Sequence, residues 1–159
     1  MTNTIENNPS LRIRNMTTAD VETIVALENR LFSDPWSPSA FEQQLTADGW
    51  GAIVAQDQNG IIGYACYFLV DVEAHLTNIA VVEVHRRKSV AKRLLDTILE
   101  RARKGGCEYL ILEVRPGNKA ALAFYEKHGF VVLYHRPNYY RRPVEDALVM
   151  VRYLDNKEV

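Results

Sequence analysis

A dense cluster of positive charge precedes an apolar helical pattern in the middle of the chain. Five cationic side chains fall within eight positions: Arg86, Arg87, Lys88, Lys92 and Arg93. An extended apolar segment precedes the cluster, and apolar residues recur at helical spacing after it. We therefore expect a strand, a basic turn and a helix, in this order. The first N–H groups of such a helix have no intrahelical acceptor, and the positive end of its dipole points at the turn. The pattern predicts an anion site that suits a ligand with several phosphates.

Two other interpretations of the same cluster stay open. A charge run is most often a solvated helix face with no ligand. A basic patch can also bind nucleic acid, but the formal net charge is −1 and no aromatic residues interleave with these cations. We therefore expect no direct contact with nucleic acid.

Two further residues have side chains that could move protons. Glu113 is the one carboxylate in the apolar run 109–114 and is a candidate general base; the alternative is an exposed carboxylate paired with Arg115. Tyr125 lies on a helix predicted between residues 119 and 128. Its phenol is a candidate general acid, and the alternative is an aromatic ring that packs in the core.

The elements that must position these residues follow from the periodicity of apolar positions. The predicted strands cover residues 11–14, 52–56, 61–70, 73–84, 109–114, 131–140 and 147–153. The predicted helices cover residues 19–31, 38–45, 90–102 and 119–128. Asn59-Gly60 predicts a hairpin, and the run 109–114 predicts a strand buried on both faces. The fold class is α+β, or mixed α/β, with a central, largely antiparallel mixed sheet of about seven strands flanked by about four helices.

Length and composition limit the class of protein. The 159 residues, 47% hydrophobic and 25% charged, predict a globular protein with one domain over residues 11–159, after a flexible N-terminal segment of residues 1–10. We find neither an apolar run of about 20 residues nor a signal-like N-terminus, so we expect a cytoplasmic protein that does not contact a membrane. Cys66 and Cys107 lack metal-ligand spacing and the four histidines are scattered, so we expect no metal.

A family resemblance adds to these predictions. Residues 86–91, RRKSVA, resemble the Gln/Arg-x-x-Gly-x-Gly/Ala signature of the GNAT superfamily of N-acetyltransferases. TNIAVV before this segment, LILEVRPGN and ALAFYEKHGF after it, and NYY near the end follow in the order found in that superfamily. With LFSDPWSPSAFEQQL near the start, the chain after residue 10 looks like the ribosomal-protein-alanine N-acetyltransferase branch, the RimI type. The resemblance implies the GNAT acyl-CoA N-acyltransferase fold.

The resemblance also implies a reaction and residues for it. Acetyl-CoA would be the co-substrate, and the acceptor would be the N-terminal α-amine of a protein, the alanine of ribosomal protein S18. Direct attack in a ternary complex would use Glu113 as proton acceptor and Tyr125 to protonate the coenzyme A thiolate. The residues implied to bind the co-substrate are Ile79, Ala80, Val81, Arg86, Arg87, Lys88, Ser89, Val90, Ala91, Lys92 and Asn118.

Several points stay open on the sequence. Ser89 stands where the signature has glycine; its Cβ would disfavour a positive φ, while its hydroxyl could bind phosphate or cap the helix. Glu73, Tyr139 and Tyr140 are predicted to shape the acceptor end of the site, with surface or packing roles as the alternative. Asn118 could equally be a plain helix cap. The alternatives in function are other protein N-termini, lysine or a small amine as acceptor, and a non-catalytic module that binds coenzyme A or RNA.

Overall fold

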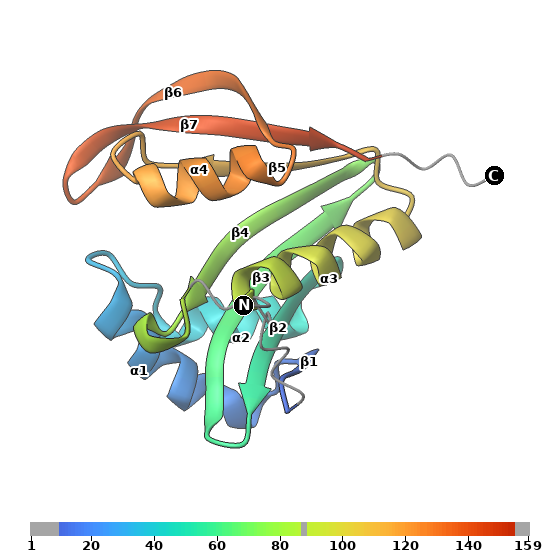
Figure 1. The fold of residues 1–159 in the computed structure, drawn as a ribbon, viewed down its shortest axis with the longest axis vertical. Coiled ribbons are helices and arrows are strands. Elements are labelled where there is room, and N and C mark those ends of the chain that lie inside the picture. Colours follow the sequence, from blue (N-terminus) through green and yellow to red (C-terminus); the bar gives the residue numbers. More distant parts are fainter. Residues whose placement is uncertain (1–9, 87–88, 155–159) are drawn as a thin grey trace, which may run out of the picture. The chain divides into compact units, whose positions relative to one another are not determined.

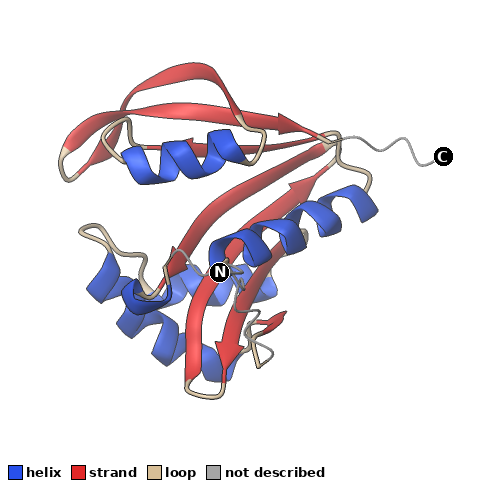
Figure 2. Ribbon diagram, viewed as in Figure 1, coloured by secondary structure: helices blue, strands red, loops and turns tan. Residues whose placement is uncertain are grey.

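A computed structural model of the chain describes residues 10–86 and 89–154. The helices in these ranges are α1 (Val21–Leu31), α2 (Pro38–Thr46), α3 (Val90–Lys104) and α4 (Lys119–Lys127), with short 3-10 turns at Thr18–Asp20 and Glu83–His85 (Figure 1). The strands are β1 (Arg12–Asn15), β2 (Trp50–Asp57), β3 (Gly60–Val70), β4 (Glu73–Val81), β5 (Tyr109–Val114), β6 (Val131–Arg141) and β7 (Val144–Tyr153) (Figure 2).

Hydrogen bonds order the strands β1-β2-β3-β4-β5-β7-β6. The pairs β1–β2, β5–β7 and β6–β7 are antiparallel, and β4–β5 is parallel. The prediction of a mixed, largely antiparallel sheet flanked by helices is therefore confirmed.

Two strands differ from their predictions. β4 ends at Val81 rather than at residue 84, because residues 83–85 form a 3-10 turn. β5 is buried on one face only: Leu110, Leu112 and Val114 are buried, whereas Tyr109, Ile111 and Glu113 are partly exposed. The continuous apolar run concealed this alternation, and Glu113 consequently lies on the more open face of the strand.

The described residues form two compact units. One contains the chain as far as Tyr67 together with Asn78–Ile98, and the other contains Phe68–Thr77 and the residues from Leu99 onward. β3, β4 and α3 contribute residues to both. That residues 11–159 form one domain stays a prediction.

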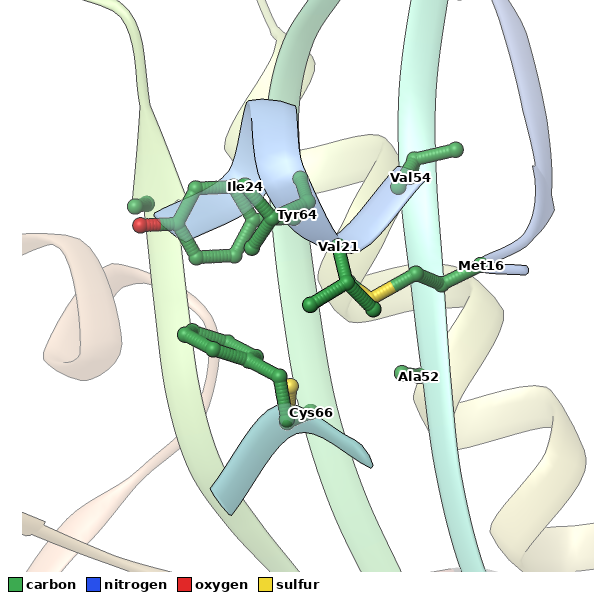
Figure 3. Close-up of a cluster of buried hydrophobic side chains, with 9 residues drawn as sticks. Met16, Val21, Ile24, Ala52, Val54, Tyr64 and Cys66 are labelled. Atoms are coloured by element: carbon green, nitrogen blue, oxygen red, sulfur yellow. The ribbon is translucent and has the colours of Figure 1, made fainter. Parts of the chain in front are cut away.

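The first unit has an apolar core between its helices and strands. Nine buried side chains form it (Figure 3): Met16, Val21, Ile24, Phe41, Ala52, Val54, Tyr64, Cys66 and Ala80. α2 begins where the Ser37 hydroxyl accepts a hydrogen bond from the Ala40 N–H (3.2 Å), with Pro38 in the first turn. The predicted hairpin is present between β2 and β3, with Gly60 at φ 120°.

In the second unit, α4 carries a candidate catalytic residue and has signals at both ends. The Asn118 side chain accepts a hydrogen bond from the Ala121 N–H (3.1 Å), and Gly129 follows the helix at φ 88°. The Tyr125 ring packs edge-on against Phe130 with centroids 5.5 Å apart. The apolar face of α4 thus holds Tyr125 in the interior of this unit.

Candidate functional site

The first turn of α3 presents backbone N–H groups, as the sequence predicts. The Arg93 N–H donates to the Ser89 carbonyl (3.0 Å), so Ser89 is the N-cap residue. The N–H groups of Val90, Ala91 and Lys92 precede this first helical hydrogen bond and lie at the positive end of a helix of 15 residues. N–H groups in this arrangement can bind an anion, and the anion site stays a prediction.

Ser89 has a positive φ of 65°. This left-handed conformation is unfavourable for an L-residue with a Cβ and is readily adopted by glycine. The turn therefore requires a left-handed backbone conformation at position 89, where the sequence has serine and the GNAT signature has glycine.

Two arginines of the basic cluster donate hydrogen bonds to backbone carbonyls near the turn. Arg86 Nε donates to the Val81 carbonyl (3.1 Å), and Arg93 Nη1 donates to the Leu11 carbonyl (3.1 Å). These bonds fix the end of β4 and the start of α3 within the first unit. The two guanidinium groups are thus part of the framework as well as a source of positive charge.

Lys92 lies on the first turn of α3 and pairs with Asp96 one turn later (2.6 Å), with both side chains about half exposed. Such a surface pair is weak and leaves the ammonium able to exchange partners. The predicted contributions of Arg87 and Lys88 lie outside the described residues.

The end of β4 approaches β3 and α3 closely. Ala80 and Val81 are buried and Ile79 is partly exposed. A Cβ built on Gly63 of β3 would lie 3.0 Å from the Ala80 carbonyl oxygen and 3.3 Å from a Val90 methyl carbon. Glycine at position 63 therefore allows the predicted co-substrate strand to pack beside the start of α3.

In the second unit, Glu113 lies beside a cation that sequence reasoning missed. Its side chain is 25% exposed, and its Oε1 is 3.7 Å from Arg136 Nη1. The suggested pairing with Arg115 is wrong, because Arg115 is bound to Glu145 and to backbone carbonyls instead. A lone arginine on a predicted strand carries no recognisable signal, so Arg136 could not have been selected from the sequence.

The side chains of Tyr139 and Tyr140 lie near the Glu113–Arg136 pair. The Arg136 guanidinium lies 4.8 Å from the Tyr139 ring centroid, and the two tyrosine rings are 4.9 Å apart, edge to face. Burial, with the Glu113 charge adding to it, raises the pKa of Tyr139. Burial and the neighbouring Tyr139 raise the pKa of Tyr140 to about 12. Both phenols are therefore uncharged at neutral pH and can act as hydrogen-bond donors.

Tyr125 is a buried phenol in the same unit. Its side chain is 6% exposed, and burial raises its pKa, with a smaller contribution from Tyr140. The ring packs in the core as the structural alternative predicts. The hydroxyl remains protonated at neutral pH, which is the state that a general acid requires.

Glu73 lies apart from the Glu113 cluster. Its carboxylate accepts a hydrogen bond from the Tyr109 hydroxyl at Oε1, and its Oε2 lies 3.1 Å from His75 Nε2. Glu73 pairs in register with Tyr109, and Glu113 is four residues further along β5, about 13 Å at the rise of an extended strand. The structure thus brings Glu113, Tyr139 and Tyr140 together and leaves Glu73 at the other end of β5.

Glu28 is a buried carboxylate that the sequence analysis did not select. It is 1% exposed and accepts hydrogen bonds from Tyr64, Asn78 and the Trp36 N–H. Its helical spacing was a usable signal, because Glu28 lies four residues after Ile24 on the apolar stripe of α1.

Across residues 10–86 and 89–154, no group of three His, Cys, Asp or Glu side chains could hold a metal ion. No helix in that same part of the chain is long and apolar enough to cross a membrane.

Comparison with known proteins gives the family. Residues 21–130 match the Acetyltransferase (GNAT) family. The chain belongs to this family. The match includes the turn at Ser89, the strand with Glu113 and the helix with Tyr125, so the GNAT resemblance of these segments is confirmed.

Relatives from two bacteria cover most of the chain. This chain is 35% identical over 143 residues to the N-alpha-acetyltransferase RimI of Mycobacterium tuberculosis, and the match covers 86% of this chain and 89% of the relative. It is 34% identical over 149 residues to the ribosomal protein bS18-alanine N-acetyltransferase of Escherichia coli K12, covering 87% and 94%. The crystal structure of the Escherichia coli ribosomal-protein-S18-alanine N-acetyltransferase matches with a TM-score of 0.83 and 30% identity over 91% of this chain and 94% of that chain. The resemblance to the RimI branch and the predicted GNAT fold are confirmed.

Proposed function

We propose that the protein transfers the acetyl group of acetyl-CoA to the N-terminal α-amine of a protein, and that the acceptor is the N-terminal alanine of ribosomal protein S18. The juxtaposition of Glu113 with Tyr139 and Tyr140 carries the proposal, because it joins a candidate base to two neutral phenols. The names of relatives that share about a third of their residues with this chain support the acceptor. We also propose that the protein is cytoplasmic.

The proposed co-substrate fits the residues of the first unit. The N–H groups of Val90, Ala91 and Lys92 would hold phosphate oxygens at the start of α3, where the helix dipole favours negative charge. The end of β4, Ile79–Val81, would lie along the pantetheine arm. The family resemblance also implies that the side-chain amide of Asn118 contacts the co-substrate. Bound acetyl-CoA supplies a thioester, an acyl group that is already activated for attack by an amine.

Two residues of the second unit would move the protons. Glu113 would accept a proton from the acceptor amine. The ordinary pKa of an α-amine, about 7.7–8.0, is close to neutral pH, so a weak base is enough to complete its deprotonation. Tyr125 would donate its hydroxyl proton to the departing thiolate, since burial keeps that phenol protonated. Neither residue forms a covalent bond with the acetyl group in this scheme.

The surroundings of Glu113 suit an N-terminal amine. The Arg136 guanidinium lies over the Tyr139 ring, the Tyr140 ring packs edge to face with Tyr139, and both phenols are close enough to Glu113 to feel its charge. An incoming cationic N-terminus would be attracted by Glu113 and would compete with Arg136 for it. The amine would then lose its proton to the carboxylate that it has joined.

Intact-mass analysis tests this proposal. The protein is incubated with acetyl-CoA and peptides that begin with the S18 N-terminus, Ala, Ser, Gly or Met, alongside N-blocked peptides that contain lysine. We expect one acetyl group on the S18 peptide and none on the blocked peptides. Acetylation of the blocked peptides would shift the acceptor to lysine. Binding of acetyl-CoA without transfer to any peptide would contradict the proposal in favour of a small amine or a non-catalytic module.

A pair of variants tests the base. Glu113→Gln keeps the shape of the side chain and removes the proton acceptor, so turnover should fall at least about 100-fold, as for loss of a general base. Glu108→Gln is the matched control, because Glu108 is an exposed carboxylate just before β5. Equal turnover in the two variants would remove Glu113 from the chemistry.

A further inference from the structure

Arg115 connects the end of β5 to the turn between β6 and β7. Its Nη1 donates to the Pro143 carbonyl (3.0 Å), and its Nη2 donates to the Arg142 carbonyl (3.4 Å). The same Nη1 lies 3.4 Å from Glu145 Oε2. One guanidinium group therefore holds two carbonyls and a carboxylate of the β6–β7 hairpin.

Glu145 completes the connection from the other side. Its Oε1 accepts a hydrogen bond from the Gly117 N–H (2.9 Å) in the turn between β5 and α4. A Cβ on Gly117 would lie 3.3 Å from that same oxygen, so a residue without a side chain suits this approach. We call these contacts the Arg115–Glu145 clamp; it consists of Arg115, Gly117, Tyr140, Arg142, Pro143 and Glu145.

The guanidinium group of Arg115 also lies over the ring of Tyr140. The guanidinium carbon lies 4.1 Å from the centroid of the Tyr140 ring. An arginine is suited to this position because its planar fork can donate to several acceptors while its face stacks on a ring, whereas lysine is a compact point charge. With 24% exposure for Arg115 and 27% for Glu145, these contacts are partly withdrawn from water, which strengthens them relative to a surface pair.

The clamp links the two segments that carry the proposed chemistry, the end of β5 and the β6–β7 hairpin. Arg115 follows Glu113 by two residues at the end of β5, and Tyr139 and Tyr140 belong to the hairpin that Arg115 binds. A hairpin held only by its own strand pairing could shift at its tip, and β6 already has an irregular register between Arg136 and Tyr140. The clamp supplies the contacts that fix this part of β6 relative to Glu113.

We propose that Arg115 and Glu145 are positioning residues for the protein acceptor, because they hold Tyr139 and Tyr140 in place beside Glu113. This inference rests on the proposed function, an N-terminal acetyltransferase. It predicts a selective effect: loosening the clamp weakens binding of the peptide, whereas the N–H groups at the start of α3 that would bind acetyl-CoA are untouched.

Steady-state kinetics of three variants with the S18 peptide and acetyl-CoA test the inference. Arg115→Lys keeps the charge and loses the fork and the stacking face, and Glu145→Gln keeps an acceptor for Gly117 and loses the charge that faces Arg115. Arg152→Lys is the matched control, because Arg152 donates to the His128 carbonyl (2.9 Å) outside the clamp. Hydrogen exchange of each variant reports whether the loosening stays within residues 139–145.

We expect both clamp variants to raise the peptide KM at least tenfold, with the acetyl-CoA KM within twofold of the wild type and faster exchange at residues 139–145. The Arg152→Lys control should match the wild type. A peptide KM unchanged in both clamp variants, or equal increases in the two KM values, would overturn the inference while leaving the proposed function intact. No transfer to any peptide by the wild type would refute the proposed function and the acceptor role of the clamp together.

Discussion

Replacing Glu28 by leucine should destabilise the protein by at least about 3 kcal/mol. The carboxylate accepts hydrogen bonds from the Tyr64 hydroxyl (2.8 Å), the Asn78 amide (2.9 and 3.2 Å) and the Trp36 N–H (3.0 Å). Leucine fills much of the same volume but accepts none of them. Three donors, of which the Tyr64 hydroxyl is buried and the Asn78 and Trp36 groups are partly buried, then lose their acceptor, at about 1–3 kcal/mol for each that water does not reach.

The Glu28 network also predicts strong non-additivity. In the wild type, Tyr64→Phe removes one donor from a buried carboxylate and should destabilise the protein by about 1–2 kcal/mol. In the Glu28→Leu background, the Tyr64 hydroxyl has already lost its acceptor, so Tyr64→Phe should be neutral or stabilising. The coupling free energy between the two positions should therefore be at least about 1 kcal/mol.

Urea denaturation at pH 7, followed by far-UV circular dichroism, gives the free energy of unfolding for the four proteins of this cycle. Tyr67→Phe is a suitable comparison for the loss of a phenol hydroxyl on β3 outside the Glu28 network. If Glu28→Leu loses less than about 1 kcal/mol, or Tyr64→Phe has the same effect in both backgrounds, the buried acceptor is not what these donors depend on.

Three further predictions address other parts of the molecule. Tyr125→Phe keeps the buried ring and removes the hydroxyl, so turnover should fall at least about tenfold with acetyl-CoA affinity unchanged by calorimetry; normal turnover would exclude Tyr125 as the acid. Ser89→Gly relieves the positive φ, so acetyl-CoA affinity should stay the same or improve, and a clear loss also seen in Ser89→Ala would identify the hydroxyl as a ligand. Arg14 hydrogen bonds lower the pKa of Asp20 to about 2, so this carboxylate stabilises the fold fully above about pH 4 and loses its contribution as the pH falls through 2. The wild type should therefore lose about 2 kcal/mol more than Asp20→Asn between pH 5 and 2 in denaturant titrations, and parallel pH profiles would contradict this.

Much of the fold could be predicted because its signals are local. The Asn59-Gly60 hairpin, the Ser37 and Asn118 caps and the glycine after α4 each depend on a few neighbouring residues. The start of α3 was predictable for the same reason, since any helix leaves its first N–H groups without intrahelical acceptors.

The contacts around Glu113 could not be predicted, because they depend on register between distant strands. Glu113 and Arg136 are 23 residues apart in the sequence and meet only because β5 and β6 both pair with β7. The one-sided burial of β5 was also hidden, since an apolar run does not reveal which alternate side chains are covered. Glu28 does lie at helical spacing from Ile24, but a glutamate on a helix is most often at the surface, and this general tendency outweighs the spacing.

The two parts of the proposed function are built from different chemical groups, and this predicts how each tolerates substitution. The start of α3 offers backbone N–H groups, which any residue except proline supplies, so a serine in place of glycine changes the conformational energy of the turn while the donors remain. The Glu113 cluster consists of side chains, each of which supplies a charge, a ring or a proton that its replacement would lack. Substitutions at residues 89–92 should therefore change acetyl-CoA affinity gradually, whereas substitutions at Glu113 and in the Arg115–Glu145 clamp should change turnover or peptide KM sharply.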